Sequence, residues 1–346
     1  MIAKFRNSSR SIGNHIDSKH MKSVIGMGNA LVDVLLQMDN DDLLDAFKLP
    51  KGSMQLVDKD LAQQIMHAVQ HLPIEVASGG SAANTIHGLA NLGLSTGYIG
   101  KIQADQYGEI FKKDMTAIGI DAYLMAGSQD TGIATTLISP DSQRTFATYL
   151  GAAVELEPTE LSRKLFKGYD FLHIEGYLVQ NHALIETAVR LARESGLKVS
   201  IDLASYNVVE DNLDFLKELV SRYVDIVFAN EEESHAFTGG DPQEALEMLS
   251  TMCEIAVVKV GAKGSMVKSR GETIFSEAIQ AAPLDTTGAG DLYAAGFLFG
   301  LCKGQPLLQC AKLGALLAGN VIEVVGPKMD AKRWNQIKMG VSELLS

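Results

Sequence analysis

The sequence predicts an α/β fold in which helices cover both faces of a mostly parallel central sheet, with a small β-sheet beside it. From Gly151 onward, segments typical of buried strands alternate with amphipathic helical segments, which is the order that builds parallel sheets. Before Gly151, a threonine-rich alternating segment with a turn at Pro140 and Asp141 predicts a hairpin. No linker divides the chain, so we expect one large domain.

The first half of the chain predicts the start of the large sheet and the whole of the small one. Two excursions, at about 34–57 and 120–150, would leave the large sheet and form a lid of β-structure. Strands are expected at 23–27 and 98–102, helices at 58–69, 82–92 and 107–118, and the hairpin at 132–149.

The second half predicts the rest of the large sheet. A late antiparallel pair, 265–268 with 272–276, would turn around Gly271, and residues 307–324 would form a final apolar helix. Parallel strands are expected at 171–174, 198–202, 225–228 and 255–260, with intervening helices such as 183–193.

Composition narrows the possible functions. A hydrophobic fraction of 46% is enough for a large core, and a net charge of -12 argues against broad nucleic-acid binding. An anionic ligand would therefore need local amides, cations or a metal. The three cysteines lack metal-ligand spacing, and the longest uncharged apolar run, Leu292 to Cys302, is far short of a membrane span. We expect a cytoplasmic protein without a membrane partner, either monomeric or homodimeric.

Residues 1–20 are basic and have no apolar segment of the kind that secretory signals contain. We expect them to form a disordered N-terminal extension before a domain that spans 21–346. A translation start at Met21 and an organelle-targeting arm are the alternatives.

The turn from Asp285 to Asp291 (DTTGAGD) is the most informative segment of the chain. It leads into a helix of small and apolar residues, and the first N–H groups of a helix lack internal partners and attract anions. Asp291 would lie at the start of that helix, where its carboxylate could take a proton from a phosphoryl acceptor. These residues alone fit equally well an aspartate that caps a buried helix.

Other polar turns follow predicted strands, and ligands in open α/β sheets bind at the carboxyl ends of strands. Asp33 could accept hydrogen bonds from two adjacent hydroxyls, with Asn84 and the Gly80 amide completing a polyol site. Stabilised turns without a ligand are the common alternative for these residues. Arg144, just after the hairpin turn, could reach a phosphate, although an isolated hairpin arginine is usually only solvated.

The acidic stretch from Asn230 to Glu233 could hold Mg²⁺, because carboxylate and amide oxygens suit hard cations. Taken alone, it is better explained as the N-terminal cap of the next helix. Two other motifs are misleading. Gly26 and Gly28 resemble the start of a dinucleotide-binding fingerprint, but Leu31 stands at the third glycine position, and the 261–265 segment lacks the spacing of a phosphate-binding P-loop.

Taken together, these motifs resemble those of the PfkB family of carbohydrate and nucleoside kinases. The resemblance extends from about Met21 to the C-terminus. Residues 285–291 resemble the C-terminal motif of the family, residues 79–84 with Gly100 and Lys101 its N-terminal motif, and residues 230–233 its NxxE element. The resemblance implies a ribokinase-like, three-layer α/β/α fold with a small β-sheet lid.

The resemblance also implies roles for individual residues. Asp291 would be the base that activates the acceptor hydroxyl, and Arg144 would lie over the transferring phosphate. Gly288, Ala289 and Gly290 would form an anion hole, and Gly261, Gly264 and Thr286 would bind ATP. Asn230 and Glu233 would organise Mg²⁺ and the phosphates, with Glu233 binding the metal through water. Asp285 and Thr287 would form a site for a monovalent cation such as K⁺.

The substrate that these motifs imply is a small molecule. Residues 28–33 and 79–85 look more like the adenosine-kinase branch than ribokinase itself, and in that branch the equivalents of Asn29, Asp33, Gly80, Ser81 and Asn84 surround the ribose. We therefore expect an ATP- and Mg²⁺-dependent kinase that converts adenosine to AMP. The alternatives are a sugar kinase for ribose, fructose or a keto-deoxy sugar acid, and a non-catalytic nucleotide- or sugar-binding protein on the same fold.

Overall fold

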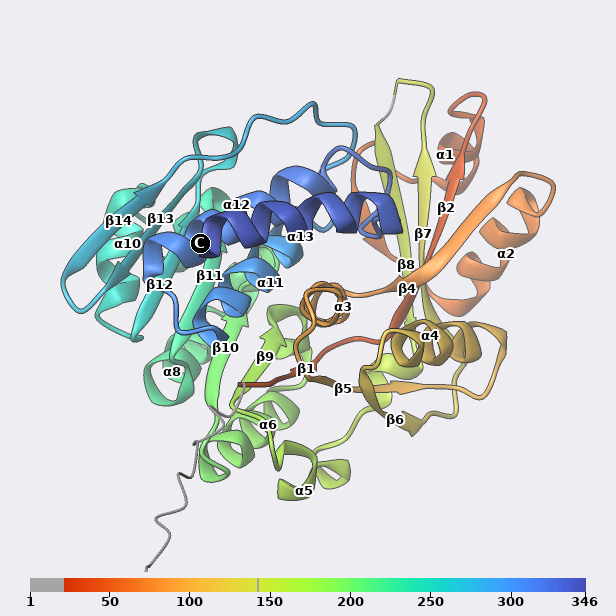
Figure 1. Cartoon of the computed structure of the whole chain (residues 1–346). Helices are drawn as coiled ribbons and strands as arrows, with labels where there is room; N and C mark the ends of the chain where they lie inside the picture. The colour runs from red at the N-terminus through yellow and green to blue at the C-terminus, as the bar shows by residue number, and fades with distance from the viewer. Residues whose placement is uncertain (1–21, 142) are drawn as a thin grey trace, which may run out of the picture.

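A sheet of nine strands forms the centre of the part of the chain that the computed structural model describes, residues 22–141 and 143–346 (Figure 1). The strands are β1 (Val24–Met27), β5 (Thr96–Ile102), β6 (Asp121–Ala126), β9 (Phe171–Glu175), β10 (Lys198–Asp202), β11 (Ile226–Asn230), β12 (Ile255–Lys259), β13 (Ser265–Ser269) and β14 (Glu272–Ser276). They stand in the order β14-β13-β12-β11-β10-β9-β1-β5-β6. β13 pairs antiparallel with both β12 and β14, and the other neighbouring strands pair in parallel, so the sheet is mostly parallel, as the sequence predicts.

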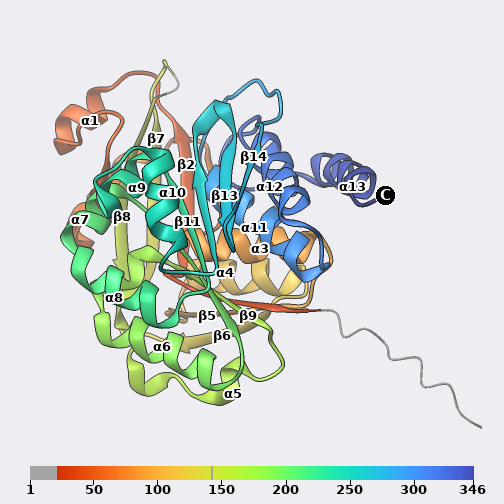
Figure 2. The ribbon, with the colours of Figure 1, turned by 90° about the vertical axis from the view of Figure 1, so that its left-hand side faces the viewer.

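Helices cover both faces of this sheet, and each face has its own buried cluster (Figure 2). Consecutive residues of β11 belong to different clusters, Val227 to one and Phe228 to the other, because side chains alternate across a strand. One face carries α3 (Ser81–Asn91), α4 (Gln106–Ala117), α11 (Ala289–Cys302), α12 (Leu307–Val321) and α13 (Ala331–Leu345). The other carries α5 (Arg163–Phe166), α6 (His182–Glu194), α7 (Tyr206–Asp211), α8 (Leu213–Tyr223), α9 (Glu231–Thr238) and α10 (Pro242–Ser250).

A smaller sheet stands beside the large one and is drawn at the right of Figure 1. Its strands are β2 (Leu31–Gln37), β3 (Met54–Leu56), β4 (Ile74–Gly79), β7 (Thr131–Ile138) and β8 (Arg144–Gly151), in the order β3-β8-β7-β2-β4. Two helices, α1 (Asp42–Phe47) and α2 (Lys59–Val69), cover one side through a cluster that includes Leu36, Leu44 and Ile65. Short 3₁₀ turns occur at Ala152–Glu155, Pro158–Glu160, Gly176–Gln180 and Gly261–Lys263.

The structure corrects the expected limits of the lid. The range 120–150 includes β6, which pairs with β5 at the edge of the large sheet instead of joining the small one. The small sheet takes in β4, which the sequence analysis did not predict because its short IEVASG segment has no clear alternation. The excursion at 34–57 contains the helix α1 as well as strands.

Two further points concern the ends of the chain. The last helix is α13, with Trp334, Ile337 and Val341 buried at helical spacing, and not the segment 307–324. The expected extension at 1–20 lies outside the described residues.

No helix within the described ranges is long and apolar enough to cross a membrane.

The helix α11, which follows the DTTGAGD turn, packs tightly against α12. A Cβ atom at Gly296 would collide with the backbone of Leu313, so the two helices approach as closely as glycine permits. Ten of the helix's residues are buried, which holds its first turn in a fixed place. The carboxyl ends of β1, β9, β10, β11 and β12 point toward this first turn, because these strands are all parallel.

Candidate active site

A cavity of about 1430 Å³ lies at the carboxyl ends of the parallel strands and is also lined by the small sheet. It brings together most of the residues that the sequence analysis selected: Asn29, Asp33, Gly80, Ser81, Asn84, Asn230, Glu233, Gly261, Gly264, Thr286, Thr287, Gly288, Ala289, Gly290 and Asp291. The two exceptions are Arg144 and Asp285, which are not among its lining residues. The predicted convergence of separate polar turns is therefore confirmed.

Asp291 is held by the first turn of α3. Ser81 Oγ donates a hydrogen bond of 2.7 Å to Asp291 Oδ1, and Asn84 Nδ2 donates one of 3.0 Å to Asp291 Oδ2. Burial raises the pKa of Asp291 to about 6, while these two hydrogen bonds favour the charged form. The carboxylate is thus mostly ionised at neutral pH and is able to accept a proton.

The start of α11 lies directly beside this carboxylate. Gly288 caps the helix with a φ of 77°, and a Cβ there would lie 2.7 Å from Pro327, so only glycine fits. The Ala289 amide donates to the Thr286 carbonyl at 3.1 Å. The Ala289 amide is thus already paired, and the amides that follow, beginning with Gly290, are the ones that could bind an anion.

Glu175, at the end of β9, joins the two turns that carry the expected substrate-binding residues. Its Oε1 accepts hydrogen bonds from Asn29 N and Asn29 Nδ2, both at 2.8 Å, and its Oε2 accepts one from Ala82 N at 2.9 Å. Burial raises the pKa of Glu175 to about 7. The sequence analysis missed this residue, since a glutamate that ends a strand carries no local sign of such distant partners.

Asp33 projects from β2 into the cavity beside Gly79, where a side chain would collide with its carboxylate. Burial raises the pKa of Asp33 to about 7, and the positive charge of Lys328 opposes this rise. The Lys328 ammonium is buried, lies 3.8 Å from Asp114 Oδ2 and has no hydrogen-bond partner among the described residues. Asp33 therefore stands in a site where hydroxyl groups of a ligand could supply the donors that its carboxylate accepts.

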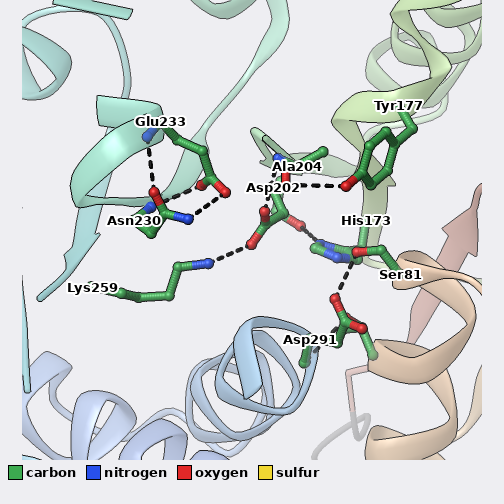
Figure 3. Close-up of polar contacts among 11 residues, drawn as sticks. Ser81, His173, Tyr177, Asp202, Ala204, Asn230, Glu233, Lys259 and Asp291 are labelled. Carbon is green, nitrogen blue, oxygen red and sulfur yellow. Dashed lines mark hydrogen bonds and ion pairs between the residues drawn. The ribbon is translucent and has the colours of Figure 1, made fainter. Parts of the chain in front are cut away.

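Asn230 and Glu233 form a reciprocal cap at the start of α9 (Figure 3). Asn230 Oδ1 accepts from Glu233 N at 2.8 Å, and Glu233 accepts from Asn230 N and Nδ2 at 2.8 and 2.7 Å. The capping explanation is therefore correct, yet both residues also line the cavity. Burial raises the pKa of Glu233 to about 7.

An ion pair that the sequence analysis missed lies between the cap formed by Asn230 and Glu233 and the Asp291 carboxylate. Lys259 Nζ is 2.7 Å from Asp202 Oδ2, and in Figure 3 the pair lies between Asn230 and Glu233 on one side and Asp291 on the other. Both residues end strands of the large sheet. Charged residues at the ends of predicted buried strands were the available sign.

Arg144 does not point into the cavity. Its guanidinium pairs with the Asp285 carboxylate and donates to Thr287 Oγ1 at 3.3 Å. Asp285 also accepts from Thr287 N at 2.9 Å and from Gly326 N at 2.6 Å. Because a guanidinium and two amides already satisfy this carboxylate, Asp285 and Thr287 do not fit a monovalent cation such as K⁺.

The remaining donors fit Mg²⁺ only in part. Among the described residues, no group of three or more His, Cys, Asp or Glu side chains is arranged to hold a metal. Glu233 offers one carboxylate beside the cavity, which fits an ion held mainly by phosphates and water.

The comparisons with known proteins decide the family. A model described as pfkB family carbohydrate kinase matches residues 54–333. The chain belongs to the pfkB family of carbohydrate kinases. Its fold and its enzyme class, a PfkB-type kinase, agree with the sequence prediction, and this membership implies ATP and usually a divalent metal.

Three relatives illustrate the range of this family. A 5-dehydro-2-deoxygluconokinase from Bacillus subtilis is 32% identical over 260 residues, which cover 70% of this chain and 80% of that protein. The structure of a probable sugar kinase from Rhizobium etli has a TM-score of 0.84 and 34% identity, and covers 94% of this chain and 99% of that one. The adenosine kinase from Sinorhizobium meliloti has a TM-score of 0.83 and 35% identity, with coverage of 92% and 99%.

Proposed function

We propose that this PfkB kinase transfers the γ-phosphoryl group of ATP to a primary hydroxyl of a ribonucleoside, the 5′-OH of adenosine. The observation that carries the proposal is the position of Asp291. Its carboxylate is bound by Ser81 and Asn84 of the expected acceptor turn, and it lies in the first turn of α11. The base, the acceptor site and the phosphate-binding amides thus meet at one residue.

The reaction follows from this arrangement. Asp291 removes the proton of the acceptor hydroxyl, the hydroxyl oxygen forms a bond to the γ-phosphorus, and the bond from that phosphorus to the bridging oxygen of ADP breaks. The amides at the start of α11 stabilise the negative charge on the transferring group. Mg²⁺ bound to the phosphates, with Glu233 nearby, would neutralise further charge.

The chemistry of the cavity wall supports a neutral acceptor with an apolar face. The small sheet contributes Leu31, Met54, Leu56 and Leu150 to the wall. Among the described lining residues Lys259 is the only lysine or arginine, whereas Asp33, Glu175 and Asp291 are acidic. A nucleoside satisfies both conditions, because its base can pack on the leucines and its ribose hydroxyls can donate to Asp33. The name of the S. meliloti relative agrees with this substrate.

A keto-deoxy sugar acid is the second candidate acceptor. The curated relatives, such as the B. subtilis 5-dehydro-2-deoxygluconokinase, support this alternative better than they support adenosine. Its carboxylate would have to bind in a wall whose charged residues are mostly acidic.

One measurement tests the proposal: ADP release from ATP with adenosine, other nucleosides, ribose, fructose and 5-dehydro-2-deoxygluconate as acceptors. Turnover on adenosine with a kcat/KM well above that of every sugar is the expected result. Turnover on the sugar acid alone would replace the first candidate with the second. Absence of turnover on the whole panel would contradict both.

A further inference from the structure

We propose that Lys259 is a further catalytic residue that binds the transferring phosphoryl group, and that Asp202 positions its ammonium. This inference rests on the proposed phosphoryl transfer but does not depend on which acceptor is used. In this role the Lys259 ammonium acts together with the amides at the start of α11 and with any metal bound to the nucleotide.

The position of the ammonium carries the inference. Lys259 ends β12, and its Nζ lies 3.1 Å from the place where a Cβ on Gly290 would stand. The ammonium is therefore next to the first turn of α11, where the phosphate-binding amides begin. In Figure 3, Lys259 points into the space between Glu233 and Asp291, which hold the expected metal-organising and base roles.

The negative charge of the cavity wall explains why phosphate binding would need a local cation such as this ammonium. With a net charge of -12 and several carboxylates in the wall, the protein would repel the phosphates of ATP unless a local cation faced them. Arg144 is not available for this task while it is paired with Asp285. Among the described residues that line the cavity, this leaves Lys259 as the cation nearest to the reacting group.

Asp202 is fixed in place to hold that cation. Its Oδ1 accepts a hydrogen bond of 3.1 Å from Ala204 N, while its Oδ2 bonds to Lys259. Ala204 has a φ of 72°, a left-handed conformation that is unusual for a residue with a side chain, and its carbonyl accepts a 3.4 Å hydrogen bond from Tyr177. The constrained turn keeps one carboxylate oxygen directed at the ammonium.

A purely structural ion pair is the competing explanation. Buried ion pairs add little net stability, because the desolvation of both charges offsets their attraction. A structural pair could also stand anywhere in the core, whereas this one lines the cavity beside Gly290. The ammonium also opposes the rise in the pKa of Asp291, which burial causes and the Asp202 carboxylate increases.

The experiment compares wild type with Lys259→Met, Lys259→Arg and the double variant Lys259→Met/Asp202→Asn, using ATP and the acceptor identified by the panel. We expect kcat to fall about 100-fold in Lys259→Met, the scale of losing one preorganised donor to a transition-state charge. The acceptor KM should change little. Lys259→Arg should recover part of the rate, because it restores the charge with a different shape. Lys112→Met, at an exposed position on α4 away from the cavity lining, is the matched control and should leave kcat unchanged.

The pH profile separates a catalytic role from a structural one. Without the ammonium the pKa of Asp291 rises, so the acid limb of the rate should move to higher pH in Lys259→Met but not in Lys112→Met. The double variant removes both charges, so it folds without an unpaired carboxylate and should still be slow. Wild-type turnover together with a near-normal rate in this folded double variant would overturn the inference alone. Failure of the wild type on every acceptor would instead overturn the proposed function.

Discussion

Ser81 and Asp291 are separated by 210 residues in the sequence, yet Ser81 Oγ donates a 2.7 Å hydrogen bond to the Asp291 carboxylate. The bond joins the first turn of α3 to the first turn of α11, so the proposed acceptor site and the proposed base are positioned against each other. Thr85 strengthens the connection by donating to the backbone carbonyl of Asp291 at 3.1 Å. The geometry of the proposed active site therefore depends on how these two helices pack.

Replacement of Asp291 by Asn should remove the base while keeping the shape of the side chain. We expect kcat to fall by about 10²–10⁴-fold, the usual contribution of a positioned base, with acceptor binding nearly intact. Steady-state kinetics and calorimetric titration of the acceptor measure the two quantities. A variant with near-wild-type turnover would contradict the assignment of Asp291 as the base.

Glu175→Gln tests whether this buried carboxyl positions the acceptor turns. The amide has only one acceptor oxygen for the three N–H groups of Asn29 and Ala82, so at least one buried donor loses its partner. A hydrogen bond to a charged group contributes about 1.5–3 kcal/mol. The acceptor KM should therefore rise by about tenfold or more, with a smaller effect on the KM of ATP. Glu186→Gln, at an exposed position on α6, should change neither constant.

Sequence alone predicts those residues of this site that belong to short motifs of neighbouring residues. The glycine turn before Asp291 and the residues Asn84 and Glu233 were selected because their neighbours in sequence form a recognisable turn or cap. Glu175 and Lys259 were missed because their partners lie 146 and 57 residues away. The sequence places Arg144 over the transferring phosphate, whereas in the structure it pairs with Asp285, 141 positions along the chain, and only the packing of the small sheet reveals that pairing.

The rate should depend on pH through two raised carboxyl pKa values. Asp291, with a pKa of about 6, and Asp33, with one of about 7, must be ionised to accept protons or hydroxyl hydrogen bonds. Protonation removes this capacity, so kcat/KM for the acceptor should rise with pH and level off about one unit above the higher pKa, near pH 8. Asp33→Asn should weaken acceptor binding, and kcat/KM should then rise with pH in one step near pH 6, from the ionisation of Asp291. A profile that is flat between pH 5 and 8 would contradict these roles.

Arg144 and Asp285 form a buried ion pair, so removal of one partner should destabilise the fold. Arg144→Met leaves the Asp285 carboxylate buried with only two amide partners, and breaking a buried pair in this way costs about 3–5 kcal/mol of unfolding free energy. Thermal and urea unfolding measure that loss, with Arg190→Met on the exposed surface of α6 as the control.

Wild-type turnover should be the same in potassium and tetramethylammonium salts, because the Arg144 guanidinium already pairs with the Asp285 carboxylate that a cation would need. Strong activation of the wild type by K⁺ would show that the ion competes successfully with Arg144 for Asp285.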